Sequence, residues 1–73
     1  MLKDRAHGRV VKVTSASDGT AVLYVVAEPD DAKALAAIRK AAAKSRDRIE
    51  IVGGASDHLL RALNVTAGAH RRI

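Results

Sequence analysis

The chain is built around one apolar stretch that contains no charged residue, Thr20-Ala21-Val22-Leu23-Tyr24-Val25-Val26-Ala27. Turn-forming residues bound this stretch, because Asp18-Gly19 precedes it and Pro29 follows it closely. A continuous apolar run between two turn signals is typical of a β-strand that is buried on both of its faces. The sequence therefore predicts a strand over residues 20–27, and the other elements are placed relative to it.

A second strand is predicted just before this stretch, over residues 9–15, which are rich in β-branched side chains. The Asp18-Gly19 pair between the two strands favours a tight turn, so the strands should be antiparallel neighbours. Lys12 would face water and protect the first strand as an edge strand. Residues 1–8 are polar and show no periodicity, which predicts a flexible N-terminal arm before a single domain over residues 9–73.

The second half of the chain alternates between helix and strand signals. An alanine-rich helix is predicted over residues 30–44, and a third strand over residues 48–52. The glycines at 53–54 should end that strand, and a short helix is predicted over residues 58–63. Residues 69–73 form either a fourth edge strand or a basic tail, and we favour the strand because a short segment after a glycine turn can pair with a sheet edge.

Together these elements predict a small α/β (α+β) domain with the order β-β-α-β-α and a short C-terminal β. Its mixed sheet of three to four strands is packed by two helices. If the strands at 20–27 and 48–52 run parallel, the helix between them makes a right-handed crossover.

Composition excludes several classes of function. The 73 residues contain no cysteine, which rules out disulfides, thiolate metal sites and thiol nucleophiles. The histidines, His7, His58 and His70, match no zinc-binding spacing. No nucleophile, base and orienting group stand in a recognisable arrangement, and a core this small leaves little room for a water-excluding pocket. We therefore expect a protein that is not an enzyme and that holds no metal or cofactor.

The sequence also predicts where the protein resides. No apolar run approaches the ~18–20 residues that cross a bilayer. Residues 1–8 have no apolar segment behind their charges, which argues against a signal peptide. We expect a cytoplasmic protein with no membrane partner.

The formal net charge of +5 favours acidic partners, either nucleic acid or an acidic protein face. Three basic residues repeat along one face of the predicted long helix, namely Lys33, Lys40 and Lys44. With Arg46, Arg48, Arg71 and Arg72 they make seven candidates for such a surface. Lysine is also the ordinary residue of a solvated helix face. The chain has a single aromatic ring, Tyr24, so it lacks a series of base-stacking platforms. A solvated surface is the simpler interpretation.

A candidate anion site lies just before the short helix. Gly53 and Gly54 would let backbone N–H groups approach an anion, and Ser56 would add a hydroxyl donor at the helix N-terminus. Asp57, however, would place a negative charge at the same position, and the pattern lacks the lysine of a P-loop. An ordinary tight turn with a serine cap explains the same residues.

The small, aromatic-poor core favours a partner subunit. If both helices pack on one face of the sheet, Val22, Tyr24 and Val26 stay exposed on the other face, and a symmetric homodimer would bury them. If the helices divide between the two faces, the chain is a monomer. The predicted function is a non-enzymatic α/β interaction module that self-associates through its sheet. The alternative is an accessory nucleic-acid or anion-binding protein that uses a basic helix face.

Overall fold

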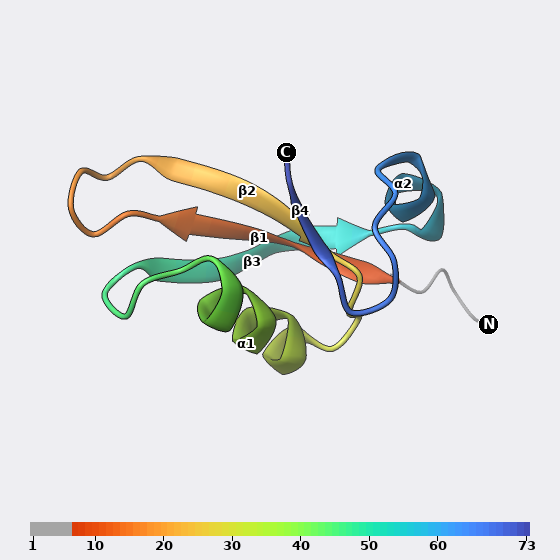
Figure 1. Ribbon diagram of the computed structural model, residues 1–73, viewed down its shortest axis with the longest axis horizontal. Coiled ribbons are helices and arrows are strands. Elements are labelled where there is room, and N and C mark those ends of the chain that lie inside the picture. The colour runs from red at the N-terminus through yellow and green to blue at the C-terminus, as the bar shows by residue number, and fades with distance from the viewer. Residues whose placement is uncertain (1–6) are drawn as a thin grey trace.

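Four strands and two helices alternate along residues 7–73, the part of the chain that the computed structural model describes (Figure 1). Their bounds are β1 (Gly8–Thr14), β2 (Ala21–Val26), α1 (Asp31–Ala41), β3 (Arg48–Ala55), α2 (Asp57–Ala62) and β4 (His70–Arg72). The order β-β-α-β-α-β confirms the predicted α+β class, and β4 confirms the strand that we favoured at the end of the chain. Neither helix in the described part is long and apolar enough to cross a membrane.

The strands form one sheet in the order β3-β1-β2-β4, and every neighbouring pair is antiparallel. The predicted mixed sheet is thus antiparallel in all its pairings, while β2 and β3 run parallel to each other on either side of β1. The prediction that β1 is an edge strand is wrong, because β3 returns beside β1. Lys12 consequently lies in the interior of the sheet, between Leu23 and Glu50 on the adjacent strands.

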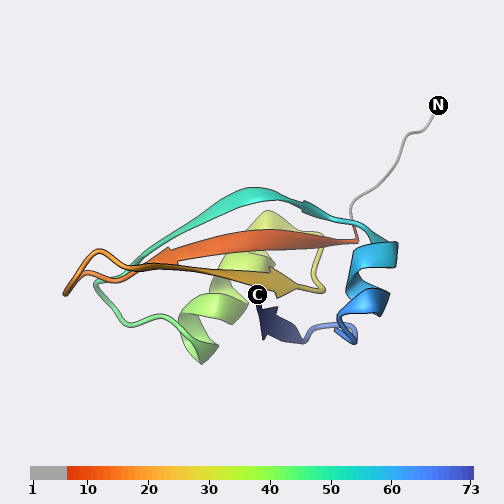
Figure 2. The same ribbon diagram turned by 90° about the horizontal axis from the view of Figure 1, so that it is seen from above.

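The two helices cover opposite faces of the sheet, with α1 below the strands and α2 above their right-hand end in Figure 1, and Figure 2 shows the same elements from above. Val26 packs with Ala34 and Ile38 of α1, whereas Val25 packs with Leu60 of α2. Successive side chains of a strand point to opposite faces, so these two valines mark two separate cores. The expected arrangement with both helices on one face is therefore wrong, and the divided arrangement is the observed one.

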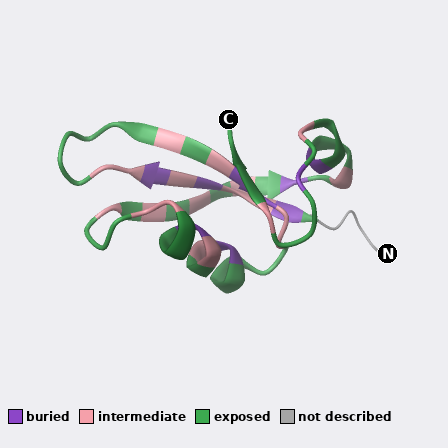
Figure 3. Cartoon of the chain, viewed as in Figure 1, coloured by how far each residue is buried: buried purple, intermediate pink, exposed green. Residues whose placement is uncertain are grey.

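Burial along β2 follows from this division. Val25 and Val26 are both 0% exposed, because α1 and α2 meet the sheet from its two sides near that end of the strand. Leu23 is 38% exposed and Ala21 is exposed, because α2 does not extend over them (Figure 3). The predicted burial of the whole stretch on both faces thus holds only for its last two strand residues.

Strand β3 runs further than predicted. Gly53 and Gly54 do not end it but pair with Val10 and Arg9 of β1. The register shifts beside Val11, which pairs with Ile51, so Val52 is the extra residue of a β-bulge. Glycine is common at such bulges, and here the glycines bend an edge strand without interrupting it.

Only the last two residues of the predicted N-terminal arm, 7 and 8, can be compared with the structure. Residues 1–6 of the predicted arm lie outside the described residues. Gly8, the last residue of that arm, instead begins β1 and is buried. A side chain at this position would overlap the main-chain carbonyl of Val26, so the close approach of β1 and β2 requires glycine here.

Candidate functional site

The predicted anion site at Gly53, Gly54 and Ser56 has a different geometry from the one expected. Both glycines are strand residues paired with β1, so they form no loop around a ligand. The Ser56 hydroxyl accepts a hydrogen bond from the Leu59 N–H at 3.1 Å and caps α2. Because the Ser56 side chain is used in capping the six-residue helix α2, this corner is an ordinary capped strand-to-helix turn, which is the simpler of the two interpretations.

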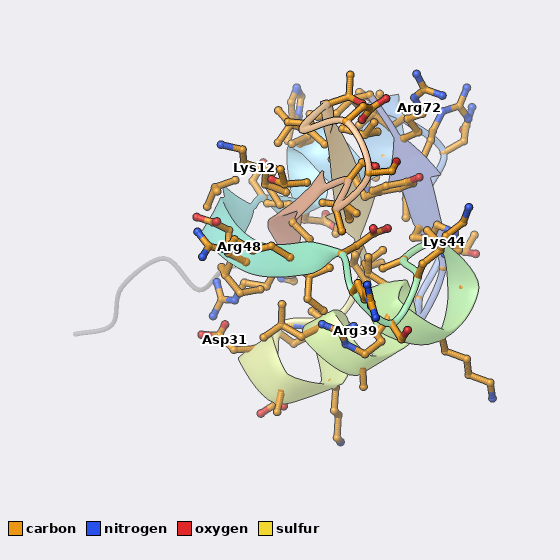
Figure 4. The ribbon with its side chains drawn as sticks, turned by 90° about the vertical axis from the view of Figure 1, so that its left-hand side faces the viewer. Lys12, Asp31, Arg39, Lys44, Arg48 and Arg72 are labelled. Carbon is orange, nitrogen blue, oxygen red and sulfur yellow. The ribbon has the colours of Figure 1, made fainter. Side chains whose placement is uncertain are left out.

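The seven candidate basic residues separate into three groups. Lys44 and Arg46 lie in the segment between α1 and β3, and Arg48 begins β3. Lys33 and Lys40 are exposed on α1. Arg71 and Arg72 belong to β4, at the opposite edge of the sheet from β3. Figure 4 shows Lys12 and Arg48 on one side of the sheet and Arg72 at its other edge. No single basic surface unites the seven.

Two of these cations line a groove of about 420 Å³ between the β1–β2 turn and the segment that follows α1. Its lining residues are Ser15, Ala16, Ser17, Lys44, Ser45, Arg46 and Asp47. The Asp47 carboxylate holds the two segments together, because it accepts hydrogen bonds from the Lys44 N–H at 3.0 Å and the Ala16 N–H at 3.1 Å. These two bonds lower the pKa of Asp47 below its ordinary value.

Arg39 supports the same segment and was not singled out in the sequence. Its guanidinium lies 3.4 Å from the Lys44 carbonyl and 3.5 Å from the Ser45 carbonyl, near the end of α1. Its position in the last turn of α1 is the only sequence signal for this role, since cations there complement exposed carbonyls.

A second cavity, of about 460 Å³, lies beside α2 and includes His7, Asp57 and Arg61 in its lining. Arg61 and Asp57 form an ion pair at 3.0 Å, so each charge already has a partner on its own helix. Within residues 7–73, no group of three or more histidine, aspartate or glutamate side chains is arranged to hold a metal ion.

The predicted self-association surface is covered within the chain. Val26 is fully buried under α1. Tyr24 packs against the same cluster and meets His70 edge-on, with 5.9 Å between the ring centres, while Val22 is half-buried. The face that carries these three residues is the one that α1 occupies, so it does not remain open as expected.

The open part of the sheet lies on the other face and is mixed in character. Leu23 and Ile73 are neighbours there, because the Ile73 N–H donates to the Leu23 carbonyl at 2.9 Å, and both are exposed. Lys12 and Glu50 continue the same row across β1 and β3. This row combines two apolar side chains with two opposite charges, which makes a polar surface with a small apolar end.

The outer edge of β3 presents unpaired backbone groups. Backbone groups of a strand point alternately to its two neighbours. The Ile73 N–H donates to the Leu23 carbonyl, so the backbone groups of Leu23 point toward β4. From this residue, the strand registers give the direction of the backbone groups of every residue in β1 and β3. Arg48 and Glu50 consequently direct their N–H and C=O groups toward β1. Ile49 and Ile51 direct theirs away from the sheet, where no strand of residues 7–73 follows.

Comparison of the chain with protein-family models, curated proteins and solved structures finds no match.

Proposed function

We propose that this protein is a non-enzymatic interaction module that binds its partner by adding a strand to the outer edge of β3. The observation that carries the proposal is the unpaired outward backbone of Ile49 and Ile51 on an eight-residue strand. An exposed edge of this kind is a template for pairing with another chain. The other edge strand, β4, has only three residues and offers a much shorter template.

The sequence favoured self-association through a sheet face left open by the helices, and it predicted a monomer if the helices divided between the two faces. Because the helices do divide, we propose self-association at the edge of β3 instead. The face with Tyr24 is occupied by α1, whereas the edge of β3 needs no rearrangement to accept a strand. Each backbone hydrogen bond gained there contributes about 0.5–1.5 kcal/mol net, so a few bonds give a reversible association. A domain of 73 residues with a small core would gain stability from it. Residence in the cytoplasm stays a prediction, consistent with the lack of cysteine.

Amide hydrogen exchange followed by NMR tests the proposal. In the free chain the outward N–H groups of Ile49 and Ile51 exchange quickly, whereas the Glu50 N–H faces β1 and exchanges slowly. Strand addition should slow exchange at Ile49 and Ile51 as protein concentration rises. Glu50 serves as the internal reference. Fast exchange at both isoleucines over the whole concentration range, in a sample that sediments as a monomer, would refute self-association at this edge.

A second candidate function is anion binding in the groove beside Asp47. It is supported by the position of Lys44 and Arg46 next to the hydroxyls of Ser15, Ser17 and Ser45. This keeps the alternative of an accessory nucleic-acid or anion-binding protein, but it moves the site from the helix face to the end of the helix.

Binding of single-stranded and duplex nucleic acid at two salt concentrations tests this candidate. Each phosphate contact should steepen the loss of affinity with salt by about 0.7–0.9 log units per log of salt. The Lys44→Gln and Arg46→Gln substitutions should weaken binding. Lys33→Gln is the matched control, because Lys33 is exposed on α1 and does not line the groove. Equal losses in all three variants would show nonspecific attraction to a basic protein.

A further inference from the structure

We infer that the strand added to β3 belongs to a second copy of this chain, paired antiparallel so that Arg48 of each copy lies opposite Glu50 of the other. This inference rests on the proposed function and names its partner and register. Two observations support it. The first is the order of charges along β3, and the second is that the bulge at Val52 and the hydrogen bond of the Asp47 N–H limit the length of edge that can pair.

The backbone restricts the pairing to two registers. In an antiparallel pair of identical strands, outward-facing residues must lie opposite outward-facing residues. Ile49 can therefore lie opposite its own copy or opposite Ile51 of the second copy. Registers centred further along the strand are interrupted by the bulge at Val52. Toward the start of β3, the Asp47 N–H already donates to the Lys44 carbonyl at 3.0 Å.

Charge selects between these two registers. With Ile49 opposite its own copy, Arg48 lies opposite Glu50 twice, once on each side of the two-fold axis. With Ile49 opposite Ile51, Glu50 lies opposite itself. Opposite charges facing each other across two strands stabilise the pair and like charges destabilise it. Arg48 and Glu50 are both exposed, and neither appears in an ion pair among the described residues.

The layer of helices is compatible with this arrangement. The two-fold axis is perpendicular to the sheet, so both copies of α1 lie on the same side of the joined sheet. Within one chain α1 packs over β1, β3 and β2, so it is centred close to β1, the middle strand of these three. Strands lie about 4.8 Å apart, so two helices centred over β1 and its copy are separated by three spacings, roughly 14 Å, which exceeds the ~8–10 Å between packed helices and leaves no collision. The outer edge is thus accessible to a whole second molecule.

The test reverses the charges of Arg48 and Glu50, singly and together, and sedimentation velocity measures the self-association of each variant. Arg48→Glu and Glu50→Arg should each weaken self-association at least tenfold, because like charges then meet across the axis. An equimolar mixture of these two variants should associate, since one chain carries two acidic and the other two basic side chains at the contact. The double variant R48E/E50R should regain association with itself. Lys33→Glu on α1 makes the same change in net charge as Arg48→Glu and should associate as the unaltered chain does.

The outcomes separate this inference from the proposal on which it rests. If both single variants associate as strongly as the unaltered chain, the register is wrong. If the mixture associates but the double variant does not, the contact between Arg48 and Glu50 is not what holds the two copies together, and the register is again wrong. In both cases slow exchange at Ile49 and Ile51 would leave strand addition at β3 intact. Fast exchange at those amides in the unaltered chain would overturn strand addition as well.

Discussion

Gly8 shows how strictly a single position can be constrained in a small sheet. It is buried at the start of β1, and a Cβ atom placed there would overlap main-chain atoms of Val26. Gly53 lies in the neighbouring strand and has open space around the same atom. Both glycines are strand residues in the same sheet, so they form a natural pair for comparison.

We predict that Gly8→Ala destabilises the fold by about 1–3 kcal/mol or more, because backbone atoms cannot move aside as a flexible side chain can. Gly53→Ala should change stability by less than about 1 kcal/mol, since alanine there meets no neighbouring atom and restricts the unfolded chain. Urea unfolding followed by circular dichroism measures both. Equal effects of the two substitutions would contradict the close approach of β1 and β2.

Asp47 is a second single residue on which the fold depends, in this case through its negative charge. The carboxylate accepts the N–H groups of Lys44 and Ala16, and these bonds lower its pKa in the folded chain. A lowered pKa means that the ionised form favours the folded state. The stabilisation is complete above the ordinary pKa of about 4 and is lost as pH falls through the folded value.

We therefore expect the midpoint of thermal unfolding to fall as the solution is acidified below about pH 4. Asp47→Asn should lower the midpoint at neutral pH and reduce its dependence on pH in this acid range. Asp18 contributes in the same direction, because hydrogen bonds from the Thr20 side chain and N–H lower its pKa as well, so the variant should retain part of the dependence. Identical pH profiles for the variant and the unaltered chain would contradict this role.

At the scale of elements, the two helices differ in how firmly they are held. α1 has eleven residues, is capped by the Asp30 side chain and buries Ala34 and Ile38. α2 has six residues, is capped by the Ser56 side chain and buries Leu60 alone. A helix this short is not stable without tertiary contacts, so α2 depends on the small core between itself and the sheet.

We predict different consequences for Ile38→Ala and Leu60→Ala. Each removes a nearly or fully buried side chain at a cost of about 2–5 kcal/mol. For Ile38→Ala this cost should unfold the whole chain, because the core under α1 joins the helix to β1, β2 and β3.

For Leu60→Ala the loss should be mostly local, with fast amide exchange in α2 and retained protection in α1 and β1. NMR hydrogen exchange distinguishes the two variants. Simultaneous loss of protection throughout the chain in both would show that the two cores unfold as one unit.

At the scale of the whole molecule, the number and length of free edges decide how far association proceeds. Pairing through β3 closes with two-fold symmetry and uses the same edge of both copies. The edges that remain are the two β4 strands, each with three exposed residues, of which two are arginines. Short, positively charged edges resist pairing with one another.

We therefore expect association to stop at the dimer. Sedimentation equilibrium over a range of concentrations should fit a monomer and a dimer without larger species, and the midpoint of thermal unfolding should rise with concentration. Charge variants of β3 should remove this rise, while Lys33→Glu should keep it. Species larger than a dimer would show that β4 or the open sheet face also pairs.

Local signals in the sequence predicted the elements that depend on neighbouring residues. The turn at Asp18-Gly19 has Gly19 at a φ of 77°, and Ser56 caps α2. Each of these depends on contacts within a few residues, so each is visible in sequence. The candidate groove was found only in part, through Lys44 and Arg46, because its remaining walls come from a distant turn.

The sequence alone established the kind and order of the elements, since hydrophobic periodicity, capping residues and turn residues all act over short distances. Only the tertiary structure decided that β1 is central, that α1 and α2 lie on opposite faces, and that β3 continues through its glycines. These features depend on which distant segments pair and which surfaces they bury. That outcome is a property of the whole packed chain, and it placed the free edge on β3 and covered the face of Tyr24.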